Sequence, residues 1–256
     1  MGLTKLASYA LAGYLPGGRY RCVLCSHRVW RFMPYMGGST DAPKLMRVMD
    51  MVGSDLDHFE CPRCGAHDRE RHLLMYLEKT GLLAGMRDKS VLHFAPEKRL
   101  ARCIIGNSPA RYVPCDLYPS TPDVQRVDML EMQFDDQSFD MVIANHVLEH
   151  VNDDLRALGE ICRVLKPSGY AILQTPYSGK LHHTWQDPGI DDDAVRLQAY
   201  GQRDHVRLFG RDIFTRFTSA GLLSRVRQHD ELLSDIDATA LGVNPKEPFF
   251  LFQRKS

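Results

Sequence analysis

Hydrophobic and polar positions follow a strand, helix, strand order in the middle of the chain. Residues 141–144 are a short apolar run, as expected for a strand buried on both faces of a parallel sheet. After the turn-like residues 145–146, apolar side chains recur at helical spacing over 155–165. The sequence Pro-Ser-Gly at 167–169 is predicted to end this helix, and 170–173 to form the next strand. The pattern predicts a right-handed crossover between parallel strands.

Further strand-like runs surround this unit. The predicted strands are 90–94, 112–116 and 127–130 before it, and 222–228 and 249–253 after it, with a helix over 212–220 that ends at Gly221. Strands that alternate with helices predict an α/β fold with a doubly wound, mostly parallel sheet.

Four of the seven cysteines form two C-x-x-C pairs, Cys22 with Cys25 and Cys61 with Cys64. In a chain without an export signal, this favours metal binding over disulfides. Two such turns supply four thiolates for a tetrahedral Zn²⁺, and the trailing Gly65 suits a zinc knuckle. Since four thiolates leave no position for water, the zinc would be structural. Buried or redox-active thiols without a metal are the alternative.

The cysteine pairs are separated by 35 residues, 26–60, which contain prolines and three glycine or serine residues in a row. Part of this insert is expected to be a mobile loop. Residues 67–85 then predict an amphipathic helix with a basic face. Arg69, Arg71 and His72 on this helix are expected either to contact an anionic group or to form a solvated face. The predicted boundaries are a zinc-ribbon-like module with its connecting helix, 1–80, and a second domain, 81–256.

Composition argues against two classes of partner. The 256 residues carry 32 basic and 32 acidic side chains, so the formal net charge is zero. This gives no general electrostatic attraction to nucleic acid or to an anionic membrane. No apolar run reaches the length of a membrane span, and the N-terminus lacks the pattern of a signal peptide. A cytoplasmic protein is therefore expected.

Several motifs carry a family resemblance. FD-x-V-x-x-x-x-VLEHV at 139–151 and LKPSGYAIL at 165–173 resemble the central motifs of class I S-adenosylmethionine (SAM) dependent methyltransferases, of the type 11-like kind. HFAPE at 93–97, GQ-x-DHVR at 201–207 and the C-x-x-C pairs resemble a bacterial zinc-ribbon subgroup. The resemblance implies a Rossmann-like sheet of seven strands, closed by an antiparallel hairpin, and SAM as the cofactor.

The cofactor residues follow from this resemblance. The family usually has an acidic-x-Gly-x-Gly loop after the first strand, whereas this chain has no glycine there. Glu97 is expected to hold the methionine ammonium, Asp116 the ribose hydroxyls and Asp128 the adenine amino group. The full predicted set is His93, Phe94, Ala95, Glu97, Asp116, Leu117, Asp128, Met129, Leu130, Asn145 and His146.

Three histidines are candidates for catalysis. Methyl transfer from SAM mainly requires the reactants to be held in line, and a base is needed only for a nucleophile that stays protonated. His205 lies in the polar block after the last parallel strand and is the first candidate for a base or a substrate contact. His146 follows a strand end and is expected to line the methyl channel. His150 is a third candidate, although it can instead satisfy a backbone group.

The sequence therefore predicts a SAM-dependent methyltransferase that acts on an oxygen or nitrogen of a small molecule, a sugar or a natural product. A second hypothesis is a degenerate methyltransferase fold whose zinc knuckles and arginines bind nucleic acid or a protein. A third keeps the catalysis and makes RNA or protein the acceptor. The zero net charge argues against nucleic acid as the partner.

Overall fold

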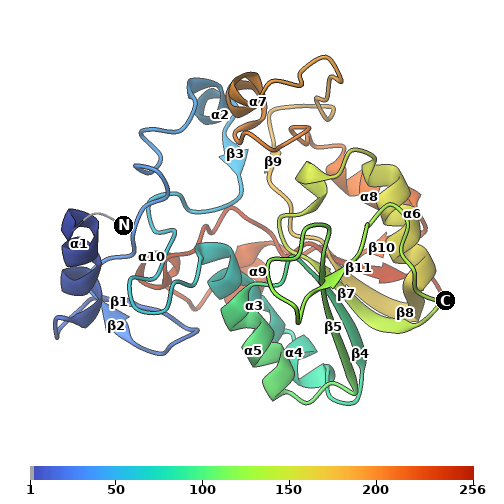
Figure 1. Ribbon diagram of the computed structural model, residues 1–256, viewed down its shortest axis with the longest axis horizontal. Helices are drawn as coiled ribbons and strands as arrows, with labels where there is room; N and C mark the ends of the chain where they lie inside the picture. The colour runs from blue at the N-terminus through green and yellow to red at the C-terminus, as the bar shows by residue number, and fades with distance from the viewer. Residues whose placement is uncertain (1–2) are drawn as a thin grey trace.

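A seven-stranded sheet forms the centre of the computed structural model, which describes residues 3–256 (Figure 1). Its strands, in spatial order, are β10 (Leu222–Ser224), β11 (Leu251–Arg254), β8 (Leu165–Ile172), β7 (Phe139–Ala144), β4 (Ser90–Phe94), β5 (Arg111–Asp116) and β6 (Gln125–Arg126). Only β11 and its partners β10 and β8 pair antiparallel, while β8, β7, β4, β5 and β6 are parallel. The predicted fold class, a mostly parallel Rossmann-like sheet with a closing hairpin, is confirmed.

Helices cover both faces of this sheet. On one face lie α3 (Asp68–Lys79), α4 (Leu82–Gly85), α5 (Lys98–Gly106), α9 (His229–Leu233) and α10 (Ala238–Leu241), and on the other lie α6 (Asp154–Val164) and α8 (Ile213–Ser219). Strand β7 contributes to both cores, because Val142 packs on the side of α6 and Ile143 on the side of α3. This two-sided burial explains why its sequence is continuously apolar from Met141 to Ala144.

The structure corrects the predicted boundaries of several strands. Strand β8 begins at Leu165, because Leu165 pairs with Phe139 before the register shifts, so the Pro-Ser-Gly turn lies within the strand. Strand β6 covers only Gln125–Arg126, not 127–130. There, the side chain of Asp128 accepts a hydrogen bond from the Leu130 amide and turns the backbone away from the sheet. Strand β10 ends at Ser224, four residues earlier than predicted.

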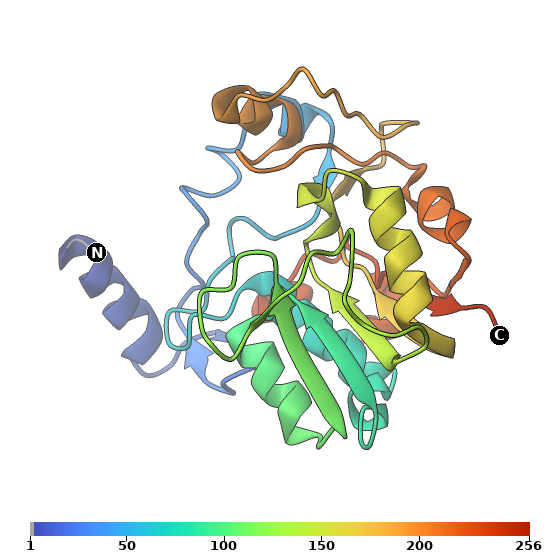
Figure 2. The ribbon, with the colours of Figure 1, turned by 45° about the vertical axis from the view of Figure 1, so that its right-hand side comes forward.

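The N-terminal segment forms a small cysteine-centred unit. Helix α1 (Leu3–Tyr14) extends from the side of the molecule (Figure 2), and strands β1 (Tyr20–Arg21) and β2 (Arg28–Val29) form the hairpin that carries the first cysteine pair. The second pair turns at Gly65, whose φ of 74° favours glycine. A small apolar core surrounds the cysteines and is made of Tyr20, Val29, Phe32 and Ala66.

The insert between the cysteine pairs, part of which was expected to be a mobile loop, carries two short regular elements. It contains α2 (Lys44–Val48) and β3 (Met51–Val52), and β3 pairs with β9 (Tyr177–Ser178), the short strand that follows β8. Helix α2 lies beside α7 (Asp193–Tyr200), as both ribbon views show. The insert therefore reaches from the cysteines to the carboxyl end of the sheet, where η1 (Leu148–His150) follows β7.

Arg71 on α3 is a buried structural residue, so its predicted place on a solvated or anion-binding face is wrong. It is fully buried, and its guanidinium lies 3.9 Å from the ring centroid of Phe32. It donates to the carbonyl oxygens of His58, Phe59, Ala66, Leu241 and Gly242. His72 is also buried. Arg71 thus connects the cysteine-centred unit to the C-terminal segment.

Candidate functional site

The four cysteines of the two pairs lie together in space. Their sulfur atoms are all within 4.8 Å of one another, with Cys22 Sγ 3.8 Å from Cys64 Sγ and Cys25 Sγ 4.0 Å from Cys61 Sγ. Four sulfurs placed tetrahedrally at about 2.3 Å from a Zn²⁺ are about 3.8 Å apart. All four are free thiols, and Cys22 and Cys61 are fully buried. The predicted grouping is thus present, with the spacing of a tetrahedral S4 site.

A charged cradle forms where β4 and β7 end. Glu97 accepts a hydrogen bond of 2.7 Å from the Asn145 side chain and lies 3.4 Å from His93 and 3.5 Å from Arg69. Burial alone would raise the pKa of Glu97, but His93 and Arg69 hold it below its ordinary value. The carboxylate is therefore ionised.

Two oxygens of this cradle have no partner at hydrogen-bond geometry, Oδ1 of Asn145 and Oε2 of Glu97, the latter 3.4 Å from Nε2 of His93. His93 and Phe94 at the end of β4 are buried, and His93 contacts Glu97 inside the protein. The loop after β4 turns without a glycine, because Ala95 adopts a φ of 44°. The Ala95 amide donates a hydrogen bond to the Cys115 carbonyl oxygen. Such a conformation costs an L-residue about 1 kcal/mol or more.

The remaining predicted cofactor residues lie along the ends of β5 and β6. Asp116 is half-buried, and Leu117 beyond it is 39% exposed. Asp128 is exposed, and Met129 beside it is buried. A hollow of about 850 Å³ reaches from Ala95 to Asp116, but Asp128 does not line it.

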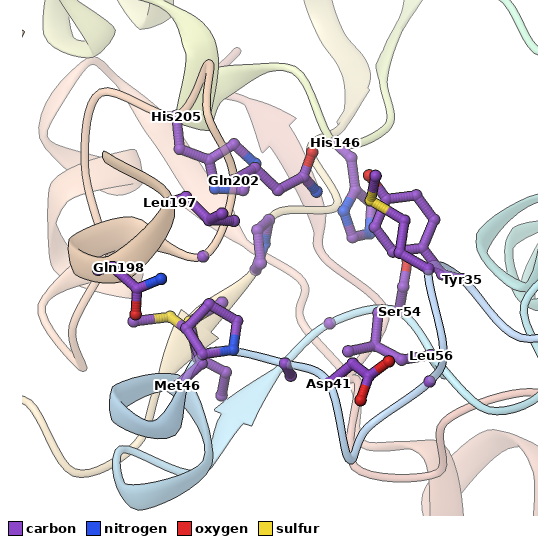
Figure 3. A pocket seen from close by; sticks show the side chains of 18 residues that line it. Tyr35, Asp41, Met46, Ser54, Leu56, His146, Leu197, Gln198, Gln202 and His205 are labelled. Carbon is purple, nitrogen blue, oxygen red and sulfur yellow. The ribbon is translucent and has the colours of Figure 1, made fainter. Parts of the chain in front are cut away.

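A separate, largely apolar cavity of about 260 Å³ lies beside the cradle (Figure 3). The insert contributes Tyr35, Met46 and Leu56 to its wall, and the carboxyl end of the sheet contributes His146 and Pro176. The segment after β9 completes it with Leu197, Gln198, Gln202 and His205. An adjoining cavity of about 420 Å³ shares Tyr35 and Gln202 and extends to Arg69 of the cradle.

His146 is held between two buried carboxylates. Its backbone has a φ of 56°, its Nε2 lies 3.2 Å from Glu247 and its Nδ1 lies 3.5 Å from Glu149. Burial alone would lower the pKa of His146, but Glu149 and Glu247 raise it to about 9. His146 is therefore a cation at neutral pH, which suits a positioning role better than that of a general base.

Stability measurements across pH should report these ion pairs. The proton on His146 stabilises the fold fully below pH 6.5, and this contribution is lost as the pH rises through about 9. Burial opposes ionisation of Glu149 and Glu247, but His146 lowers the pKa of each to about 2. Their contribution is therefore present above pH 4.5 and lost as the pH falls toward 2. We expect the cluster to stabilise most between about pH 4.5 and 6.5.

The measurement is the urea midpoint at pH 6.5 and 9, for the unmodified chain and for His146→Gln. The midpoint should fall at pH 9 in the unmodified chain. His146→Gln should be less stable already at pH 6.5 and should lose less on going to pH 9. The exposed His183→Gln is the control and should behave like the unmodified chain. Equal losses in all three proteins would contradict the assignment.

His150 and His205 lie close to Glu149, with one ligand atom of each of the three residues within 4.8 Å of the others. Burial lowers the pKa of His205, so its imidazole is neutral at pH 7. The rings of His150 and His205 meet edge to face, with centroids 4.7 Å apart. His205 lines the cavity, whereas His150 does not. The structure thus brings the three predicted histidines to one region.

Several site residues were missed by sequence reasoning. Glu149 lies in the LEHV motif, directly before His150, but no function was predicted for it. Glu247 has no local signal, since it lies 101 positions from His146. Tyr35 and Leu56 were also missed, because the insert that carries them was expected to be mobile.

Comparisons with known proteins agree with this geometry. Residues 106–173 match the sequence model of a family described as "Methyltransferase domain". The chain is also 29% identical over 164 residues to the ubiquinone/menaquinone biosynthesis C-methyltransferase UbiE of Idiomarina loihiensis. Both matches are to methyltransferases, and the strand order is that of a Rossmann-like methyltransferase fold. The UbiE match covers 62% of this chain and 54% of that protein, so the chain spans about half the length of its curated relative.

Solved structures of similar shape include methyltransferases. A SAM-dependent methyltransferase from Mesorhizobium loti is 14% identical, with a TM-score of 0.46 over 70% of this chain and 97% of that one. A Burkholderia thailandensis 1,6-didemethyltoxoflavin-N1-methyltransferase with bound S-adenosylhomocysteine is 13% identical, with a TM-score of 0.48 over 71% and 79% of the two chains. In residues 3–256, no helix is sufficiently long and apolar to cross a membrane.

Proposed function

We propose that this protein transfers the methyl group of SAM to an oxygen or nitrogen atom of a small-molecule, sugar or natural-product acceptor. The observation that carries the proposal is that two adjacent residues at the end of β7 belong to two different sites. Asn145 contacts Glu97 of the charged cradle, and the next residue, His146, lines the apolar cavity. Cofactor and acceptor would therefore meet at this pair of residues.

The cradle fits the methionine end of SAM. Its buried Glu97 and Asn145 present two oxygens without partners at hydrogen-bond geometry, which suit the three N–H donors of an ammonium group. Arg69 lies within 3.5 Å of Glu97 and is only partly exposed, so it can pair with the methionine carboxylate. His93 would position Glu97. At the end of β5, Asp116 would accept the ribose hydroxyls, and Asp128 with Met129 and Leu130 would contact the adenine.

When bound, SAM supplies an activated methyl carbon on a sulfonium. The chain has to place the acceptor atom in line and exclude water. His146 is fixed by two carboxylates and can hold a polar group of the acceptor. The neutral His205 can accept a proton if the acceptor is a hydroxyl. His150 would help to orient His205, whose ring it contacts edge to face.

The size of the cavity favours a small acceptor. A volume of about 260 Å³ with mostly apolar lining suits a compact organic molecule. The alternative hypothesis is that arginines of α3 bind nucleic acid. Arg71 is not available for this, because it is engaged with five carbonyl groups inside the protein. Neither a protein nor an RNA acceptor has an observation in its favour.

We also propose that Cys22, Cys25, Cys61 and Cys64 hold a structural Zn²⁺. The sulfur separations of 3.8 and 4.0 Å support this, as does the grouping of all four sulfur atoms within 4.8 Å of one another. Four protein ligands would close the site to water. The seven free cysteines suit a reducing compartment such as the cytoplasm. On this proposal, the two parts of the chain are a zinc-ribbon-like module, 1–80, and a methyltransferase domain, 81–256.

Titration calorimetry with S-adenosylhomocysteine tests the cofactor site. The unmodified protein should bind it, and Asp116→Ala should bind about a hundredfold more weakly, because two hydrogen bonds to a carboxylate contribute about 3 kcal/mol together. The control is Asp235→Ala, which removes an exposed carboxylate paired only with Lys79. Unchanged affinity in Asp116→Ala would contradict the ribose assignment. No binding by the folded, unmodified chain would overturn the proposed function.

A further inference from the structure

We propose that Glu149, His150 and His205 form a binding site for a divalent cation at the wall of the apolar cavity. Each of the three residues offers one ligand atom, and these atoms all lie within 4.8 Å of one another. Two imidazoles and one carboxylate on one side of an ion are a set that suits first-row metals such as Mn²⁺, Fe²⁺ and Co²⁺.

Unpaired buried atoms give the first support. Glu149 is 1% exposed and His205 is 2% exposed. Neither carboxylate oxygen of Glu149 has a hydrogen-bond partner, nor does Nε2 of His205. The nearest charged neighbour of Glu149 is His146, at 3.5 Å. Buried polar atoms are nearly always paired, so three orphans in one cluster indicate a missing ligand.

The opposite ring nitrogens give independent support. Nδ1 of His205 lies 3.0 Å from the Tyr200 carbonyl oxygen, and Nδ1 of His150 lies 3.3 Å from that of Asp204. A carbonyl oxygen only accepts, so Nδ1 of each ring is the donor in these contacts, and Nδ1 of His150 also lies 3.3 Å from the Asp204 carboxylate. Histidines that bind metals commonly donate their other N–H in this way.

The two segments that carry the ligands are fastened to each other. The Val206 amide donates to the Glu149 carbonyl at 3.0 Å, which places His205 next to Glu149. Arg207 is buried and donates to the carbonyl oxygens of Leu148, Val151 and Asn152. The ligand geometry is therefore held before any ion binds, which lowers the entropic cost of binding.

Three protein ligands leave coordination positions free. Of the three ligands only His205 lines the cavity, so the site adjoins the space assigned to the acceptor. A cation there would coordinate water or an oxygen atom of the acceptor and lower the pKa of that oxygen ligand. It would take the lone pair of His205, so the cation would replace His205 in activating a hydroxyl. This last consequence rests on the proposed function, whereas cation binding does not.

The test is Mn²⁺ binding, followed by electron paramagnetic resonance and by water proton relaxation. Mn²⁺ is the probe because it favours nitrogen and oxygen over thiolate ligands. Protein carrying one equivalent of zinc should bind one Mn²⁺ per chain and enhance water relaxation. Glu149→Gln and His205→Gln should each weaken binding at least tenfold. Glu231→Gln and His183→Gln, which change exposed residues, should bind as the unmodified chain does.

Three results would overturn the inference. They are no saturable Mn²⁺ binding below millimolar concentration, equal binding by both cluster variants, and binding without relaxation enhancement, which would mean a site closed to the cavity. Thermal melting of each variant shows whether it is folded. S-adenosylhomocysteine binding is measured on the same samples, so loss of the cofactor site is distinguished from loss of the cation site.

Discussion

Replacing Arg71 with methionine is expected to lower the free energy of unfolding by about 4 kcal/mol. The guanidinium donates to five backbone carbonyl oxygens, and methionine fills a similar volume without any donor. Buried acceptors that lose a charged donor keep the full cost of desolvation, about 1–3 kcal/mol each, although such costs are not additive. The loss of the contact with Phe32 adds to this.

Urea unfolding followed by circular dichroism measures this effect. The matched control is Arg225→Met, because Arg225 is exposed and its side chain pairs with Gln253 alone. The control should stay within about 0.5 kcal/mol of the unmodified chain. Arg71→Lys should recover little, since an ammonium has three donors and cannot span five acceptors. A loss below 1 kcal/mol in Arg71→Met would show that water or local rearrangement satisfies the carbonyls.

Arg71 also shows what the sequence could not reveal. Its charge suggested a solvated helix face, because local pattern alone gives no sign of a buried arginine. The partners that bury it come from the cysteine-centred unit and from residues about 170 positions away. The same applies to Glu247, whose pairing with His72 and His146 depends on tertiary structure.

The sheet was easier to predict, because its signals are local. Strand β7 is apolar from Met141 to Ala144 because both of its faces are buried, and Asp153 caps α6 by accepting from the Arg156 amide. Boundaries were less accurate where the structure uses a bulge, as at Leu165, or a side-chain turn, as at Asp128. Propensity does not encode such features.

The candidate site was predictable in part, less well than the sheet but better than the partners of Arg71 and Glu247. Strand ends placed Glu97, Asn145 and His146 correctly at one edge of the sheet, because parallel strands share that edge. The cavity wall from the insert was not predicted, because Pro and Gly residues there suggested mobility. Pairing of β3 with β9 overrides that local tendency.

Loss of the zinc site is the second large effect expected. Cys61→Ser should reduce bound zinc from one per chain to none, since Cys61 is buried and its serine replacement provides no thiolate. Structural zinc contributes about 10 kcal/mol or more to small folds, so the knuckles should unfold locally. Because both ends of the insert are fixed by the knuckles, the wall at Tyr35 and Leu56 should loosen with them.

Hydrogen exchange with elemental analysis can separate this local effect from global unfolding. In Cys61→Ser, amides of β1, β2 and β3 should lose protection, while those of β4 and β7 keep it, because the sheet has its own cores. S-adenosylhomocysteine should still bind, since of the cradle residues only Arg69 lies within the first 80. Cys103→Ser is the matched control, a free cysteine on α5 outside the cluster, and should retain zinc and protection. Full protection of β1 and β2 in Cys61→Ser would mean that thiol packing alone, without metal, stabilises the knuckles.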